Sequence, residues 1–425
     1  MTIVIPPGPL GTSGGSIAHL REHNLSRILL VLATDSPLSR AQIAGRTGLG
    51  ITAMTKLIAE LRDRQLVMEV ADTNPATMGR PTSLITLARH YWATASLSLD
   101  NGSIYASIGG IDGKYSTSFT VATPISLEID AYIKYVGLAL DRIAEECRSA
   151  GQILLAVEAS VPGAVNNSSG VMMRSVLNGW FRPYPLRQVL SELVSAIDAG
   201  VSPSILVGID RATNYSLLSR LQDLDLPGDF ETVAHLGGLY AVSGGIYSRS
   251  ALEHGSTGLA GEFGHFVIDP TGAQCWCGRR GCVETQLGLA GIYSRCSIMD
   301  SVEADLVPQL ARRHEEMVEE LLTRARSGEQ QVLKALDQAG YWLGIAVDTI
   351  AAVVNPRVLI IDGYLAALQE YLQPEMRKQL ASIGALPSIT DLNIIFAEDP
   401  FTPVNRGMHI AAGLAVAHHP GSAVH

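Results

Sequence analysis

Apolar residues recur with a helical period close to the N-terminus. One apolar stripe at the spacing i, i+3, i+4, i+7 is formed by Leu25, Ile28, Leu29 and Leu32. Ser39 and Gln42 then make the pattern of a capping box, which predicts a second helix over residues 40–47. The glycines of residues 48–50 supply a tight turn before a third helical pattern. Three short helices with a glycine turn before the last predict a helix-turn-helix.

The third helical pattern has an apolar face and an opposite, mostly polar face. Its apolar stripe is Met54, Leu57, Ile58 and Leu61. The opposite face presents Thr52, Ala53, Thr55 and Lys56. The last helix of a helix-turn-helix enters the major groove of DNA with its N-terminal residues on the base edges. We therefore expect this second set of residues to contact DNA.

The segment LVMEVADTNPATMGRPTSLITL after the third helix has two β-rich arms around an Asn-Pro turn. Such a hairpin makes the unit a winged helix. Arg80 lies at the wing between Gly79 and Pro81, where an arginine can enter the negative potential of a minor groove. A three-helix module that contacts protein rather than DNA is the alternative interpretation.

Beyond Ala88 the pattern changes to that of an α/β body. Residues 93–121 alternate β-type runs with Asp-Asn-Gly and Asp-Gly turns, which predicts a three-stranded antiparallel meander. Strands expected near 154–159 and 205–207 alternate with helical stretches such as 186–199, and a second strand-glycine-strand unit begins near Thr232. Two similar lobes are predicted, with the cleft between them as the expected ligand site.

Charge separates a small head from the body. The 425 residues carry a net charge of −10, but residues 1–90 hold nine Lys/Arg against six Asp/Glu. A basic head on an acidic body indicates two functions. We expect a flexible tail over 1–20, a winged helix-turn-helix over 21–88 and a body over 89–425. The two lobes of the body are expected at about 89–208 plus the C-terminal helix, and at about 209–404.

The chain has no run of about 20 uncharged apolar residues and no signal-peptide pattern, so we expect a cytoplasmic protein without a membrane partner. Its five cysteines are odd in number, and three of them are clustered. They fit a reducing compartment and a metal better than disulfides. Cys147 and Cys296, outside the cluster, are expected to be buried as small hydrophobic residues.

The clustered cysteines form the pattern H-x9-C-x-C-x4-C with His265, Cys275, Cys277 and Cys282. Three thiolates and an imidazole suit four-coordinate zinc. Four protein ligands close the coordination shell, so the zinc is expected to be structural, and a zinc hydrolase with an open position is excluded. The spacing C-x-C with a third cysteine favours a metal over a redox pair. Arg279 and Arg280 in the turn are expected to be solvated charges.

The stretch GLAGEFGHFVIDPTGAQCWCGRRGCVET, residues 258–285, resembles the signature of the ROK family (repressors, open reading frames and kinases), AGE-x-GH followed by C-x-C-G-x-x-G-C-x-E. SRAQIAGRTGLGITAMTKLIAELRDRQLV and GRP resemble the winged helix of the family's repressors, of the xylose and N-acetylglucosamine repressor type. Its kinases lack that unit. The resemblance runs from about residue 20 onward. It implies an actin-like (ribonuclease H-like), two-lobed sugar-kinase fold, a zinc in the cysteine cluster and a sugar in the cleft.

The resemblance also implies sugar contacts. Glu262, His265 and Glu284 match positions that hydrogen-bond sugar hydroxyls in the family. Carboxylates accept from vicinal hydroxyls, and a metal on one histidine nitrogen fixes the tautomer and leaves the other nitrogen to donate. Asp210 stands at the position of the kinase's general base, and Asn178 lies within a residue or two of a sugar-binding Asn. Alternatively, Glu262 or Glu284 caps a helix or pairs with an arginine.

The phosphate-binding segments of the kinases are altered in this chain. The turn D-x-G-G-T is replaced by DNGSI at 100–104, and G-T-G-I-G by LYAVS at 239–243. Asp362 stands where the family has a glycine and is expected to repel phosphates. Since phosphoryl transfer depends on positioned phosphates, we expect no enzyme activity, with Asp210 a remnant of the base. Arg211 is expected either to pair with Asp210 or to meet the phosphate of a sugar phosphate.

Together these features predict a sugar-responsive transcriptional regulator with a degenerate kinase body. Its expected partners are a double-stranded DNA operator, a small sugar or sugar phosphate as effector, and a second copy of the chain in a homodimer or dimer of dimers. The sugar is expected to relieve repression, and activation is the alternative direction of regulation. An ATP-dependent sugar kinase that carries a DNA-binding domain is the competing hypothesis.

Overall fold

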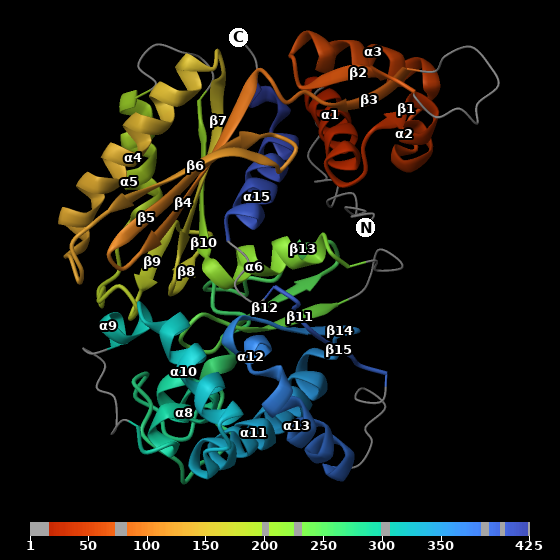
Figure 1. Cartoon of the computed structure of the whole chain (residues 1–425). Coiled ribbons are helices and arrows are strands. Elements are labelled where there is room, and N and C mark those ends of the chain that lie inside the picture. Colours follow the sequence, from red (N-terminus) through yellow and green to blue (C-terminus); the bar gives the residue numbers. More distant parts are fainter. Residues whose placement is uncertain are drawn as a thin grey trace.

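A small N-terminal head lies beside one end of a two-lobed body (Figure 1). The computed structural model describes residues 17–72, 83–197, 204–224, 232–298, 307–383, 391–399 and 404–423. The mixed α/β class predicted from the sequence is confirmed. Within the described residues, no helix is both long enough and apolar enough to span a bilayer.

Three helices and a three-stranded sheet form the head, which we define as the described residues between 17 and 87. Its elements are α1 (Ile17–Thr34), β1 (Leu38–Ser39), α2 (Arg40–Thr47), α3 (Ile51–Asp63), β2 (Val67–Ala71) and β3 (Ser83–Leu87). The capping box of α2 is present, because Ser39 Oγ accepts from the Gln42 N–H and the Gln42 side chain accepts from the Ser39 N–H. β3 pairs antiparallel with both β1 and β2. The helices and both hairpin arms therefore lie where the pattern predicts them.

The head is held together by the predicted apolar stripes. All eight residues of the two stripes are buried, and they pack in one cluster with Ile43 of α2 and Ile85 of β3. Burying a leucine or isoleucine side chain contributes roughly 1.5–3 kcal/mol, so these contacts supply most of the favourable free energy of so small a unit.

The first lobe is built on a five-stranded sheet with the order β10-β7-β4-β5-β6. Its elements are β4 (Trp92–Asp100), β5 (Ser103–Gly110), β6 (Tyr115–Ala122), α4 (Ile129–Ser149), β7 (Ile153–Val161), β8 (Ala164–Asn166), β9 (Val171–Arg174), α5 (Leu186–Ile197) and β10 (Leu206–Arg211). The meander β4-β5-β6 is antiparallel, whereas β7 and β10 run parallel to β4. The boundary expected after residue 208 falls inside β10, which stays in this sheet as far as Arg211.

The second lobe repeats that arrangement with the order β13-β12-β11-β14-β15. Its elements are α6 (Ala212–Leu221), β11 (Val233–Gly237), β12 (Ser243–Ser248), β13 (Ala251–Leu252), η1 (Phe263–His265), α7 (Val283–Leu287), α8 (Leu289–Arg295), α9 (Val307–Ala311), α10 (His314–Arg326), α11 (Gln330–Val354), β14 (Val358–Ile361), α12 (Gly363–Ala367), α13 (Gln369–Ile383) and β15 (Asn393–Phe396). Again two antiparallel pairings are followed by two parallel ones. This duplicated topology is that of the actin-like fold, as the resemblance implied.

Two helices connect the lobes with each other and with the head. The last long helix, α15 (Asn405–His418), packs on β4 and β7 of the first lobe and against α6, which lies on β12 of the second lobe. The two helices approach closely: a Cβ on Gly407 would lie 1.8 Å from the Tyr215 carbonyl oxygen. The short 3-10 helix η2 (Pro420–Ala423) follows α15.

The head is joined to the body by a continuous apolar core. Leu25 and Ile28 of α1 belong to the same buried cluster as Trp92 of β4 and Val416 of α15. Polar contacts add to this joint, since the Trp92 indole N–H donates to the Arg64 carbonyl at 3.0 Å. Arg64 itself bonds Glu22, Glu60 and the Pro420 carbonyl. The head is thus packed on α15 and the first lobe rather than tethered by a loose linker.

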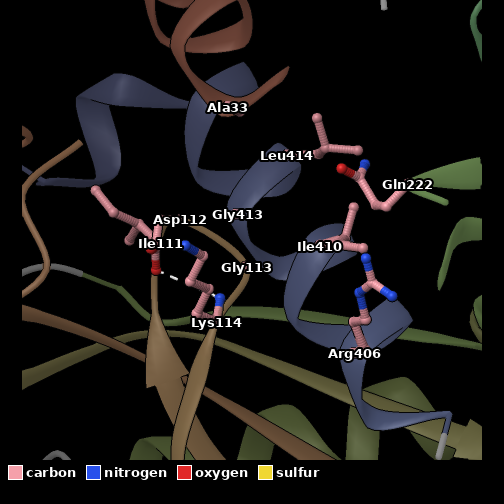
Figure 2. Close-up of a pocket in the computed structure, with 10 residues that line it drawn as sticks. All are labelled: Ala33, Ile111, Asp112, Gly113, Lys114, Gln222, Arg406, Ile410, Gly413 and Leu414. Atoms are coloured by element: carbon pink, nitrogen blue, oxygen red, sulfur yellow. Dashed lines mark hydrogen bonds between the residues drawn. The ribbon is translucent and has the colours of Figure 1, made fainter. Parts of the chain in front are cut away.

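A pocket lies beside this joint (Figure 2). It is lined by residues of α1, the β5–β6 turn, the end of α6 and α15: Ala33, Ile111, Asp112, Gly113, Lys114, Gln222, Arg406, Ile410, Gly413 and Leu414. Two of its charged side chains are already paired, Asp112 with Arg89 and Arg406 with Asp223. The pocket leaves one side of α15 without close packing.

Candidate functional site

The Cys/His knot (His265, Cys275, Cys277 and Cys282) comes together in space as the spacing predicts. One ligand atom from each residue lies within 4.8 Å of the others. Cys277 Sγ lies 3.6 Å from Cys282 Sγ, and Cys275 Sγ lies 3.8 Å from His265 Nδ1. A tetrahedron of ligands at about 2.0–2.3 Å from zinc has edges of roughly 3.3–3.8 Å. The donor set and these separations therefore fit a four-coordinate metal ion.

Close backbone turns wrap the knot. Gly281 adopts φ of 69°, and a Cβ there would lie 1.4 Å from the Asp269 carbonyl oxygen, so only glycine fits. The Cys275 N–H donates to the Arg279 carbonyl, and the Gly278 N–H donates to the Cys275 carbonyl. The side chains of Arg279 and Arg280 are exposed and reach backbone carbonyls of His265 and Gly272. They are exposed, as expected, and their hydrogen bonds also hold the loop.

The knot is partly buried, which affects its titration. Burial raises the pKa of Cys282 to about 11 and raises the pKa of Cys275 further, while it lowers the pKa of His265. Without a cation these thiols hold their protons at neutral pH. A metal must displace the protons, so its affinity is expected to rise with pH. Cys147 and Cys296 are buried in the hydrophobic cores, as expected.

Asp210 lies at the end of β10 and is almost completely buried, with 4% of its surface exposed. Its Oδ1 accepts from the Asn214 side chain at 2.8 Å, and its Oδ2 lies 2.7 Å from His254 Nε2. His254 follows β13 of the second lobe and is 31% exposed. Asp210, which the resemblance compares with a kinase base, thus forms a contact between the two lobes.

Arg211 does not pair with Asp210 through its side chain, one of the two alternatives expected from the sequence. Its guanidinium donates to Glu262 Oε1 at 2.6 Å, to Asn214 Oδ1 at 3.2 Å and to the Ala260 carbonyl. Glu262 precedes η1, whose last residue is His265. The ion pair therefore connects the first lobe to the knot, and the alternative in which Glu262 pairs with an arginine is the one observed here.

Glu284 lies on α7, two residues after the last cysteine of the knot, and is buried. Burial raises the pKa of its carboxyl to about 8, even though the Val242 N–H donates to it at 2.6 Å and Trp276 adds a hydrogen bond. At neutral pH this carboxyl keeps its proton. It can therefore donate a hydrogen bond as well as accept one.

Asn178 is 2% exposed and donates from Nδ2 to the Leu99 carbonyl at 2.7 Å. Its Oδ1 is buried and has no hydrogen-bond partner within the described residues. A buried acceptor without a partner costs free energy, which a ligand donor can recover. The amide is thus placed at the end of β4 with one atom available.

The altered phosphate turn between β4 and β5 is in contact with the second lobe. Asn101 Nδ2 donates to the Pro308 carbonyl of α9 at 2.7 Å. Gly102 has φ of 91°, and a Cβ there would lie 3.0 Å from Cζ of Arg312. The Gly102 turn, which the resemblance compares with a phosphate loop, is therefore covered by the Arg312 side chain.

Asp362 does not act as an isolated negative charge, contrary to our expectation. Arg220 donates to both of its carboxylate oxygens, at 2.8 and 2.9 Å, and His235 Nε2 lies 3.1 Å away. These partners outweigh the effect of burial and lower the pKa of Asp362 to about 2. Its Oδ1 also accepts from the Gly363 N–H at the start of α12. The carboxylate is neutralised and structural, so it is not evidence against a phosphate ligand.

The predicted DNA-contacting face of α3 is exposed. Thr52, Ala53, Thr55 and Lys56 all face solvent, opposite the buried stripe. Most arginines of the head are already paired, for example Arg46 with Asp35 and Arg40 with Glu69. Lys56 forms no ion pair in the described part of the chain, so its charge is available to a phosphate.

Several residues of this region were missed by the sequence analysis. Asn214 was missed because it lies on α6, whereas Asp210 ends β10, so no single periodicity links the two residues. His254 could not have been found, since it is 44 residues from Asp210 and no spacing rule links them. Arg174, at the end of β9, was also missed, because no sequence motif marks it.

Glu158 is a second buried carboxyl near Asp210. It lies on β7 and accepts from the Tyr215 hydroxyl of α6 at 2.5 Å. Burial raises the pKa of Glu158 to about 7, the nearby Asp210 raises it further, and Tyr215 opposes the shift.

We predict that the contribution of Glu158 to the free energy of unfolding falls by up to roughly 3 kcal/mol as the pH rises from about 4.5 to 7, and then stays constant. In that window the unfolded chain releases the Glu158 proton while the folded protein keeps it. Glu158→Gln is expected to remove this component. Denaturant unfolding of both proteins at pH 5 and pH 8 measures it, and an equal pH dependence in the two would contradict the assignment.

Known proteins share both sequence and fold with this chain. Residues 241–397 match the ROK family. The chain is 22% identical over 395 residues to the DNA-binding transcriptional dual regulator NagC of Escherichia coli (strain K12), covering 90% of this chain and 91% of that protein. It is 25% identical over 256 residues to a glucokinase of Halalkalibacterium halodurans, covering 60% and 74%.

A solved structure described as a ROK family transcriptional regulator, homologue of the Escherichia coli Mlc protein, has the same fold. The TM-score is 0.75 at 18% identity, and the match covers 95% of this chain and 99% of that one. The likeness therefore includes the head as well as both lobes of the body.

Proposed function

We propose, from the premise that this chain contains a ROK family domain, that it is a sugar-responsive DNA-binding transcriptional regulator. The single observation that carries the proposal is a head with the exposed helix face of a helix-turn-helix, packed directly on the two-lobed body. The similarity to NagC extends over both parts, whereas the similarity to the glucokinase covers 60% of the chain.

The DNA-binding half of the proposal rests on α3. Thr52, Ala53, Thr55 and Lys56 would meet base edges and phosphates in the major groove. Arg80 lies outside the described residues, and it would enter the adjacent minor groove. A two-fold homodimer, or a dimer of dimers, would read a palindromic operator. Repression relieved by the effector is the sign we propose.

The sensing half rests on polar groups from both lobes. Glu262, His265, Glu284, Asp210 and Asn178 would bind the hydroxyls of a sugar. Zinc in the Cys/His knot would be structural, since four protein ligands leave no open position. It would fix the tautomer of His265 and so the hydrogen-bonding role of the second ring nitrogen.

Coupling between the halves would pass through α6 and α15. Asp210 and Arg211 immediately precede α6, α6 packs against Gly407 of α15, and α15 shares a buried core with α1. A sugar that binds one arrangement of the lobes better than the other would shift α15 and the head with it.

We also propose that the body has lost kinase activity. Arg312 covers the turn at Gly102, and Arg211 holds Glu262 beside the position of the base. Phosphoryl transfer needs free, positioned phosphate contacts. The glucokinase relative supports the competing hypothesis, a sugar kinase that carries a DNA-binding domain, and Asp210 would be its base. A coupled ADP-release assay with hexoses and pentoses tests it: turnover abolished by Asp210→Ala would overturn our proposal.

The regulator is tested by fluorescence anisotropy of the full-length protein on DNA from its own upstream region, at fixed salt, across a panel of sugars and sugar phosphates. Specific binding that one of these compounds shifts is the expected result. If the protein binds DNA but none of the compounds changes that binding, the proposal that the body senses an effector is wrong. An absence of specific DNA binding would make the head a protein-contact module.

We predict that Lys56→Ala weakens binding to all DNA sequences alike and lowers the slope of log affinity against log salt by about one, because one phosphate contact is lost. The same anisotropy titrations, repeated at several salt concentrations, measure it. Lys134→Ala, an exposed lysine on α4 of the body, is the matched control. An unchanged salt slope in Lys56→Ala would place the DNA surface elsewhere.

A further inference from the structure

Arg174, at the end of β9, lies between aromatic rings from the two lobes. Its Cζ is 5.3 Å from the ring centroid of Phe181 in the first lobe and 5.7 Å from that of Trp276 in the Cys/His knot. Phe181 is 49% exposed, and Trp276 is half-buried. A guanidinium held at this range from two ring faces is fixed in position and partly shielded from water.

The charge of Arg174 is not neutralised by the protein. Within the described residues Arg174 has no ion pair and no side-chain hydrogen bond, and its Nε is buried without an acceptor. Arg174 itself is half-buried, and it differs from the fully buried arginines of the described body in having no ion pair. Arg211 pairs with Glu262 and Arg220 with Asp362, although Arg211 Nε is likewise buried without an acceptor. A buried donor without a partner costs free energy, which a ligand acceptor would recover. The structure thus holds a cation ready for an acceptor that the chain does not supply.

Trp276 connects this cation with the residues that we propose for sugar binding. Its ring meets the His265 ring edge-on, with the centroids 4.5 Å apart, and it forms a hydrogen bond with Glu284. Arg174 therefore lies one side chain away from two of the proposed sugar contacts. A substituent on a sugar bound there is within reach of the guanidinium.

We propose that Arg174 recognises an anionic substituent of the effector, either a carboxylate or a phosphate. This inference rests on the proposed function and narrows the effector to a negatively charged sugar. A guanidinium presents a planar fork of donors that matches both anions in bidentate geometry, and such charge-assisted bonds are about twice as strong as neutral ones. An uncharged sugar leaves the Arg174 Nε without an acceptor.

Calorimetric titration of the full-length, metal-loaded protein tests the proposal. The probes are glucose and N-acetylglucosamine, their 1-phosphates and 6-phosphates, and the carboxylates gluconate and glucuronate. We expect at least one charged derivative to bind about 10-fold or more tightly than its uncharged parent. Comparing the phosphate probes with the carboxylate probes identifies which anion the protein binds.

Arg174→Met is expected to lower the affinity for the charged ligand by about 10- to 100-fold. It should leave the affinity for the uncharged parent within about 2-fold of the unmodified protein's. Arg174→Lys keeps the charge but loses the planar fork of donors, so its affinity for the charged ligand should lie between those of Arg174→Met and the unmodified protein. Arg182→Met is the matched control, because Arg182 is an exposed arginine of the same segment. Equal losses for charged and uncharged ligands in Arg174→Met would make Arg174 a structural bridge and overturn the inference.

The outcomes separate this inference from the proposed function. If an uncharged sugar shifts DNA binding and every charged derivative binds no better, the regulator stands and the anionic effector is wrong. If none of the probes binds and none shifts DNA binding, the anion preference fails together with the sensing half. A charged derivative that binds tightly through Arg174 but leaves DNA binding unchanged supports the site and contradicts the coupling.

Discussion

Cys277→Ser is expected to weaken zinc binding by at least about 100-fold and to abolish the effector response with it. The binding free energy of structural zinc sites, about 10–16 kcal/mol, corresponds to roughly 2.5–4 kcal/mol for each of the four ligands. Without the metal, the loop from His265 to Cys282 loses its main constraint, and Glu262 and Glu284 flank that loop. Metal content after dialysis and calorimetric titration of the effector measure the two losses.

Cys147→Ser is the matched control for that experiment, because Cys147 is buried in the first lobe away from the knot. It should lose some stability and keep its zinc. Full effector affinity in metal-free Cys277→Ser protein would show that the knot does not shape the sugar site. Normal DNA affinity in the same variant, by contrast, is expected, since the core that joins the head to β4 and α15 contains no residue of the knot.

Gly407→Ala is expected to destabilise the protein by about 1–3 kcal/mol and to uncouple the effector from DNA binding. The added Cβ would lie 1.8 Å from a backbone oxygen of α6, so α15 must move away from that helix. The ratio of DNA affinities with and without effector should fall towards one. Denaturant unfolding and DNA anisotropy with saturating effector measure the two effects.

Gly137→Ala on α4 separates packing from helix propensity. Its Cβ would meet only Leu193 Cδ2 at 3.9 Å, which is an ordinary contact. This control should gain roughly 0.5–1 kcal/mol from the better helix propensity of alanine and keep its effector response. A Gly407→Ala protein with full stability and full response would contradict the role that we give to the contact between α6 and α15.

Local patterns in the sequence predicted the head and the knot well. The apolar stripe and the capping box of α2 are determined within a few residues, and the knot is formed by four ligands that lie within 18 residues of one another. Such features depend on helix period, hydrogen-bonding groups and metal chemistry that act over short stretches. The two-lobed body was also predictable, because its turn spacing and its family signature are local.

Contacts between distant segments could not be predicted in this way. Arg211 pairs with Glu262, 51 residues away, and the sequence offered Asp210 or a phosphate as its partners. Asp362 was expected to repel phosphates, but it is paired with Arg220, 142 residues away. Both pairings are decided by how the sheets and helices pack, and no periodicity or spacing in the chain encodes that.

The continuous core between α1, β4 and α15 limits which operators such a protein can read. Because only four residues separate β3 from β4 and Trp92 is fixed to Arg64, the orientation of each reading helix follows that of its body. A two-fold pair of such rigid units would demand a fixed helical phase between half-sites. Adding about five base pairs, half a turn of B-DNA, would turn the second half-site to the opposite face, while adding a full turn would restore its phase.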